Sequence, residues 1–96
     1  MLNKMKQEMT REEIVKALRI IISQELRNQN YYLLTSRILE KACLLRLREH
    51  QKFLLIKIAD KKVAFSCYVE ALDSLLNDGH IHVHQTQKRI SVSHRP

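Results

Sequence analysis

The sequence predicts a mainly α-helical α+β domain, in which three or four helices precede a C-terminal two-stranded β-hairpin. Three observations lead to this fold class. Neither glycine nor proline, the usual interruptions of helices, occurs between Met1 and Asp78. Upstream of the only glycine, Gly79, apolar residues recur at helical spacing, whereas residues 80–94 alternate between apolar and polar. Gly79 therefore marks the boundary between a helical part and a hairpin.

The length and composition indicate one globular domain. The chain has 96 residues, of which 45% are hydrophobic and 28% are charged. We expect residues 10–94 to form a single domain and residues 1–9 to form a flexible N-terminal segment. No apolar run approaches the roughly 18 residues of a membrane span, and no signal-peptide stretch is present. The two cysteines, Cys43 and Cys67, are expected to be buried free thiols in a cytoplasmic protein.

The first helix is expected to begin at Thr10 and to end in the polar residues 28–30. Thr10 and Glu13 have the spacing of a capping box, in which each side chain accepts a hydrogen bond from the backbone N–H of the other residue. The apolar face that follows consists of Ile14, Ala17, Leu18, Ile21 and Ile22. Residues 31–34 could be a brief strand or the lead-in to the next helix, because four residues are too few to show a period.

A second helix is predicted from the possible caps Thr35 and Ser36 to about His50. At 100° per residue it is apolar on two sides, which are Ile38, Ala42 and Leu45 on one side and Leu44 and Leu47 on nearly the opposite one. A helix of this kind usually has two packing partners. Another helix of the same chain or a second subunit could be the second partner, and we predict a homodimer.

The same helix carries a basic stripe. Its members fall within about 60° of each other on the helical wheel, and they are Arg37, Lys41, Arg48 and Lys52. Such a stripe is either a solvated helix face or a phosphate-binding surface.

Residues 53–63 are ambiguous. They could form strands around residues 60–62, but their apolar spacing favours a short helix that ends near Lys62. A further helix over residues 66–77 is predicted from its apolar residues, which are Tyr68, Val69, Leu72, Leu75 and Leu76.

The hairpin is expected to have the register in which Gln85 pairs with Lys88 across Thr86 and Gln87. A four-residue loop of the same phase is favoured over this two-residue loop, because neither Thr86 nor Gln87 favours a positive φ. This register places Ile90 opposite Val83 and Val92 opposite Ile81, so that all four lie on one face. The other face receives His80, His82, His84, Arg89, Ser91 and Ser93. The three histidines are weak candidates for metal ligands, but a zinc site needs a third or fourth ligand in register, and the cross-strand partners are serine and arginine. We therefore expect no metal site.

Residues 35–94 resemble a winged helix-turn-helix domain. The resemblance rests on Ile58 and Ala59, which match positions on the second helix of the family's pattern, and on Val69 and Leu72, which match its recognition helix. The sequence LLNDGHI at residues 75–81 is similar to the family's ending before the wing. It implies a winged-helix fold, DNA binding and a role in transcription regulation or a similar accessory role.

The charge of the chain indicates an anionic partner, because the formal net charge is +7 and the pI is about 9.7. We expect DNA to be held through phosphate contacts. The candidate residues are Arg37, Lys41, Arg48, Lys52, Lys61, Lys62, Lys88, Arg89 and Arg95.

The predicted recognition helix is acidic, with a net charge of −3 over residues 64–79. Its carboxylates would be repelled by the phosphate backbone. The alternative function is therefore a protein-interaction module in a larger assembly. Its candidate contacts are Leu44, Leu47, Glu70 and Asp73.

Catalysis is not expected. With one glycine the chain lacks the phosphate-cradling loops of nucleotide-dependent enzymes, and it contains neither an HExxH nor a GxSxG motif. No cofactor is predicted.

Overall fold

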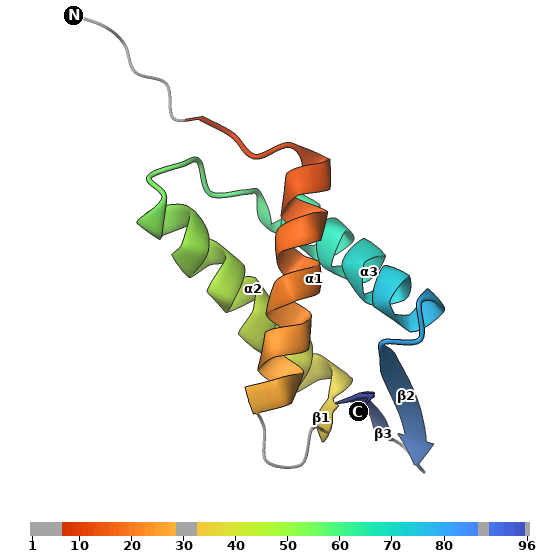
Figure 1. Cartoon of the computed structure of the whole chain (residues 1–96). Helices are drawn as coiled ribbons and strands as arrows, with labels where there is room; N and C mark the ends of the chain where they lie inside the picture. The colour runs from red at the N-terminus through yellow and green to blue at the C-terminus, as the bar shows by residue number, and fades with distance from the viewer. Residues whose placement is uncertain (1–6, 29–32, 87–88, 96) are drawn as a thin grey trace, which may run out of the picture.

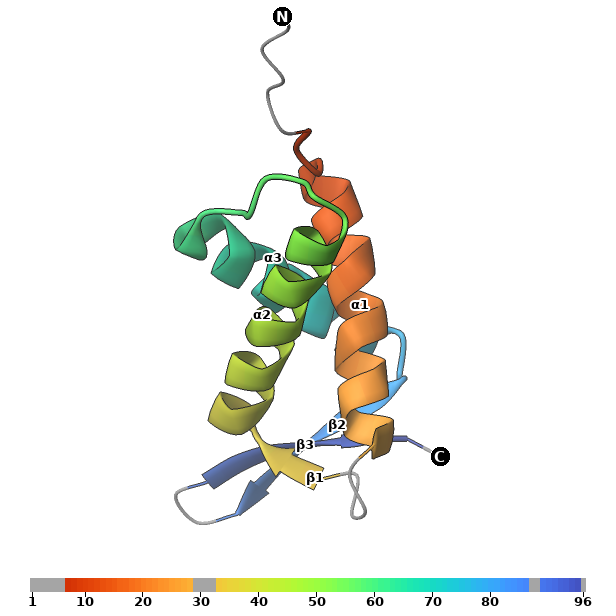
Figure 2. The ribbon, with the colours of Figure 1, turned by 90° about the vertical axis from the view of Figure 1, so that its left-hand side faces the viewer.

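The computed structural model describes residues 7–28, 33–86 and 89–95. These residues form three helices and three strands in the order α1 (Arg11–Asn28), β1 (Leu33–Thr35), α2 (Ser36–Phe53), α3 (Lys61–Asn77), β2 (Ile81–Thr86) and β3 (Arg89–His94). The strands form one antiparallel sheet in the order β1-β3-β2, which closes one end of the layer of helices (Figures 1 and 2). The predicted α+β class is confirmed. None of the described helices is long and apolar enough to cross a membrane.

Side chains at the predicted positions cap the first two helices. The Thr10 N–H donates to Glu13 Oε1 over 2.8 Å, and the Glu13 N–H donates to Thr10 Oγ1 over 3.1 Å, which confirms the capping box. Thr35 caps α2, because its hydroxyl accepts from the Ile38 N–H over 3.4 Å. The residues left open between the two helices contain β1, so Leu33–Thr35 is a short strand. Residues 29–32 lie outside the described residues.

The prediction that residues 53–63 form a short helix ending near Lys62 was wrong. α2 continues to Phe53, residues 54–60 form a loop, and α3 begins at Lys61. The reason is local, because the carboxylate of Asp60 accepts the Lys62 N–H over 3.1 Å and so starts a new helix. Ile58 and Ala59 therefore lie in the loop rather than in a helix, unlike the positions that the family resemblance assigned to them.

The loop also holds part of the N-terminal segment. The backbone N–H of Lys57 donates to the carbonyl of Gln7 over 2.9 Å, and Lys57 Nζ lies 3.6 Å from Glu8 Oε2. Residues 7–9 of the predicted flexible segment are thus in contact with the domain, and residues 1–6 lie outside the described residues.

α2 and α3 end in the same backbone motif with different residues. In each helix the residue after the cap has a positive φ, which is 58° at Leu55 and 75° at Gly79. After α2 the Leu55 N–H donates to the carbonyl of Lys52, and the Ile56 N–H donates to the carbonyl of Gln51. After α3 the Gly79 and His80 N–H groups donate in the same way to the carbonyls of Leu76 and Leu75. Glycine is the residue suited to this conformation, so only α3 ends without steric cost.

Exchanging the residue type at these two positions should change stability in opposite directions. Gly79→Ala is expected to lower the free energy of unfolding by about 1 kcal/mol, because a Cβ is strained at positive φ. Leu55→Gly is expected to raise it by about 0.5–1 kcal/mol, since the Leu55 side chain is 79% exposed and adds little to the packing of the protein. Urea unfolding of both variants measures the two effects. Two changes of the same sign would contradict the assignment of the motif.

The core lies between the three helices and the sheet. α1 contributes Leu18, Ile22 and Leu26, and the sheet contributes Ile81 and Val92, all at most 2% exposed. α2 contributes Leu39, Cys43 and Leu47, and α3 contributes Cys67, Tyr68, Ala71 and Leu75.

The predicted apolar faces of α2 need correction. Leu47 is 1% exposed and belongs to the core, which makes it unsuitable for an exposed protein-interaction face. Ile38 and Leu45, on the other side of the helix, are 55% and 60% exposed. The physical reason is that α1 and α3 pack on the side of α2 that carries Cys43, so the second apolar side lies outside the core formed by the described residues.

The hairpin has the predicted faces but another register. Val83 pairs with Val92 and Gln85 pairs with Ile90, so each residue of β2 meets a partner two positions further along β3 than predicted. The shift extends the ladder toward the helices, where the Arg95 N–H donates to the carbonyl of His80 over 3.1 Å. Since a two-residue shift keeps every side chain on its face, the apolar face survives. The predicted loop residue Lys88 lies outside the described residues.

Candidate nucleic-acid interface

The basic stripe of α2 is exposed over its whole length. Arg37, Lys41, Arg48 and Lys52 all point away from the core. Lys41 and Arg48 also border a groove between α2 and the first turns of α3, which has a volume of about 460 Å³. Lys61 and Phe65 of α3 line this groove opposite the stripe.

Most cations of this region have no carboxylate partner among the described residues. Among all the described residues, ion pairs join Arg11 to Glu70, Arg19 to Asp78, Arg46 to Glu25, Lys52 to Glu49 and Lys57 to Glu8. The cations left without an ion pair on α2 and at the start of α3 are Arg37, Lys41, Arg48, Lys61 and Lys62. The charge of α1 is thus partly neutralised, whereas the charge around the groove is available to an anion.

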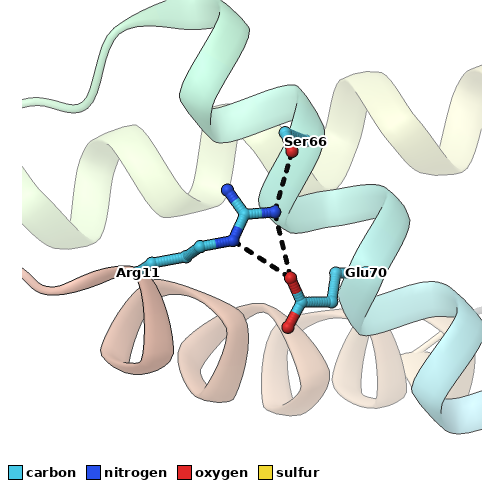
Figure 3. Close-up of polar contacts among 3 residues, drawn as sticks. All are labelled: Arg11, Ser66 and Glu70. Atoms are coloured by element: carbon cyan, nitrogen blue, oxygen red, sulfur yellow. Dashed lines mark hydrogen bonds and ion pairs between the residues drawn. The ribbon is translucent and has the colours of Figure 1, made fainter.

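α1 partly neutralises the acidic residues that follow the start of α3. The Arg11 guanidinium donates to Glu70 Oε1 over 3.1 Å and to Ser66 Oγ over 2.8 Å (Figure 3). At the other end of the helix Arg19 binds Asp78 Oδ2 over 2.9 Å. These pairs are about half exposed, so they contribute little stability but reduce the negative potential of α3.

The bounds of α3 differ from those of the expected recognition helix, and its net charge differs as a result. α3 begins at Lys61 and ends at Asn77, so it includes two lysines that precede residues 64–79 and excludes Asp78. It therefore contains two lysines and two carboxylates, and its net charge is zero. The lysines are Lys61 and Lys62 in the first turn, and the acids are Glu70 and Asp73. An N-cap at Asp60 is the sequence signal that identifies this earlier start.

The hairpin brings one of its predicted phosphate contacts to the same side. The hairpin ends of β2 and β3 and the first turn of α3 project to one side of α2, the left in Figure 2. Arg89 begins β3 at this end. Arg95 follows the strand at its other end, about 20 Å along the chain, and its guanidinium lies near Gly79. The structure therefore does not bring Arg95 together with the other cations.

The three candidate metal ligands, His80, His82 and His84, lie in or beside β2 and do not form a metal site with other described side chains. His82 and His84 share the face that points away from the helices, with ring centroids 6.3 Å apart. His84 Nε2 lies 2.7 Å from Ser93 Oγ, and His80 precedes β2. Within the described part of the chain no three histidine, cysteine or acidic side chains are placed to share a metal ion.

His94, the last residue of β3, has a lowered pKa. Burial, the nearby Arg27 guanidinium and His80 lower its pKa, and Arg27 Nε donates to His94 Nε2 over 3.4 Å. A neutral imidazole accepts this bond, so His94 stays uncharged further into the acid range than an ordinary histidine.

The two cysteines are buried and free, as predicted. Burial raises the pKa of the Cys43 thiol to about 12, with a smaller contribution from Glu25. Burial also raises the pKa of the Cys67 thiol. Both thiols are therefore protonated at neutral pH and are poor nucleophiles.

The four predicted protein-interaction residues do not form one surface. Leu47 is in the core, Leu44 is half-buried in the groove, Glu70 is paired with Arg11, and Asp73 is exposed on α3. The sequence did not point to Leu45 and Phe65 as neighbours, although both line the groove and are 60% and 46% exposed.

The first turn of α3 and the start of β3 thus lie on the same side of α2 (Figure 2), and Lys41 and Arg48 of the stripe border the groove between α2 and α3. Lys61 lines the same groove from α3, and the walls of the groove include apolar residues of both helices. No protein-family model, no curated protein and no solved structure matches this chain, so its function is inferred from its own geometry.

Proposed function

We propose that this chain is a winged-helix DNA-binding protein with a regulatory or accessory role. The order of elements supports the proposal, because two successive helices, α2 and α3, are followed by a glycine and a two-stranded ribbon. In this interpretation α3 is the recognition helix and the hairpin is the wing. Duplex DNA would contact the side to which both project.

The observation that carries the proposal is the group of unpaired cations on that side. Lys41 and Arg48 of α2 line the groove opposite Lys61 of α3, and none of the three has an ion pair to a described carboxylate. Arg37 and Lys62 are also exposed and also lack such a pair. The two lysines occupy the first turn of a helix that has no acidic residue there. Cations are unfavourable at a helix N-terminus because of the helix dipole, whereas a phosphate is favourable at the same place. The Asp60 carboxylate already caps this turn at the Lys62 N–H, and a phosphate beside the two lysines would compensate the positive charge that remains.

Charge reversal of the stripe tests the proposal. The double variant Lys41→Glu/Arg48→Glu is expected to bind a random-sequence duplex about 10- to 100-fold more weakly at low salt. The slope of log K against log salt should also become shallower by about 0.9 for each phosphate that the variant no longer neutralises. Fluorescence anisotropy over a salt series measures both quantities.

Lys16→Glu is the matched control, because Lys16 is an exposed cation of α1 that lies outside the groove. It makes the same change of charge as either substitution and should leave most of the affinity intact. Equal losses in the control and in the Arg48→Glu variant would show that only the net charge matters. Absence of duplex binding by the unmodified protein at low salt would exclude the function.

The predicted homodimer stays a prediction. Ile38 is the exposed apolar residue of α2 that lies furthest toward its N-terminus, and it could contribute to a subunit contact. Measurement of the native mass tests this part of the proposal separately from DNA binding.

A further inference from the structure

The groove between α2 and α3 has apolar walls that phosphate binding does not explain. Leu45 is 60% exposed, Phe65 is 46% exposed and Ile58 is 36% exposed. All three line the same groove, together with the half-buried Leu44 and Ala64. A contiguous exposed apolar surface with a charged rim is typical of a site for another molecule.

We propose that this groove binds an acidic amphipathic helix of a partner protein. The proposal goes beyond DNA binding and does not depend on it. The partner's apolar residues would replace water over Leu45 and Phe65, and its carboxylates would lie against the cations of the rim. This mode of recognition, a helix laid in a groove, places anchors at positions i, i+4 and i+7.

The dimensions of the groove favour a helix over a small molecule. The lining residues of α2 run from Glu40 to Gln51, which corresponds to about 16 Å or three helical turns. The groove is open to solvent along this length, since Lys41, Leu45 and Arg48 on its edge are all exposed. A segment of three turns can therefore lie beside α2.

The charge of the rim determines which partner fits. Lys41 and Arg48 stand on the α2 side and Lys61 stands on the α3 side, and none of them has an ion pair among the described residues. Glu40 is half-buried and is the acidic residue among those that line the groove. A second copy of this chain that presented the same stripe would bring cations against cations. An acidic partner is complementary instead.

The test uses a synthetic helical peptide of 16 residues, with leucine at four positions spaced i, i+4, i+7 and i+11 and with glutamate on both sides of that stripe. We expect saturable binding in fluorescence anisotropy, with a dissociation constant in the micromolar range. Leu45→Ala should weaken binding at least about fivefold. Leu55→Ala is the matched control, because Leu55 is 79% exposed but lies outside the groove.

The rim is tested in the same assay. Lys61→Glu should weaken binding, and Lys16→Glu should leave it unchanged. Equal binding of a peptide with the same composition in scrambled order would overturn the proposal, since attraction of charge alone would then be sufficient. An unchanged affinity of the Leu45→Ala variant would overturn it as well.

Two further measurements separate this proposal from other interpretations. If the unmodified protein is a dimer and Leu45→Ala converts it to a monomer, a second copy covers the groove and the proposal is wrong. If the protein binds the peptide and binds no duplex, the DNA-binding function fails while the peptide site stands. Competition between peptide and duplex would support the site at the shared rim.

Discussion

Replacing Leu39 by alanine is expected to lower the free energy of unfolding by about 2–5 kcal/mol. Leu39 is fully buried and forms the core side of α2 together with Cys43 and Leu47. The adjacent Ile38 is 55% exposed, so that Ile38→Ala should cost no more than about 0.5 kcal/mol. Urea unfolding of the two variants under the same conditions measures the difference.

The two neighbours form a matched pair, because both substitutions shorten an aliphatic side chain on the same turn of the same helix. Helix propensity changes little between them and favours alanine in both cases. A decrease in stability at Ile38 as large as that at Leu39 would mean that another surface covers Ile38 or that α2 is rotated about its axis.

α2 also shows why the sequence did not determine which side of a helix faces the core. Apolar residues are present at consecutive positions over 42–45, so the wheel has two apolar sides of similar width. The choice depends on where α1 and α3 pack, and they pack on the side of Leu39, Cys43 and Leu47. Tertiary packing of this kind is not encoded in the period of one helix.

Signals that act within a few residues were predicted more accurately. The capping box at Thr10, the cap at Thr35 and the helix end at Gly79 all depend on hydrogen bonds between near neighbours in the sequence. The loop over residues 54–60 was missed because its sequence is apolar and favours a helix. Leu55 ends α2 in a conformation that leucine rarely adopts, which no pattern of hydrophobicity reveals.

The candidate site likewise has one part that could be predicted from local sequence and another that depends on tertiary packing. The stripe of α2 could be predicted, because residues at spacings of three, four and seven lie on one face of any helix. The groove could not, because its second wall is α3, whose start and direction depend on Asp60 and on the packing of the loop. The pairing of Glu70 with Arg11 is likewise an interaction between residues 59 positions apart.

Replacing Gln51 by leucine should also lower the free energy of unfolding, by less than Leu39→Ala does. Gln51 is 1% exposed. Its Oε1 accepts the Ala59 N–H over 3.1 Å, and its Nε2 lies 3.5 Å from the Met9 sulfur. Leucine fills much of the same volume but leaves the Ala59 N–H without a partner, which should cost about 1–3 kcal/mol. Lys52→Leu, at an exposed neighbouring position, should remain within about 0.5 kcal/mol.

Hydrogen exchange at the Ala59 amide distinguishes this mechanism from general destabilisation. In the Gln51→Leu variant the Ala59 amide should exchange faster than amides elsewhere in the loop, because only its acceptor has been removed. Unchanged protection of that amide would contradict the assigned role. Ala59 directly precedes Asp60, the cap of α3, so Gln51 fixes the position of Lys61 across the groove from Lys41. The same variant should therefore bind both duplex and acidic peptide more weakly, although Gln51 lines the groove with only 1% of its surface exposed.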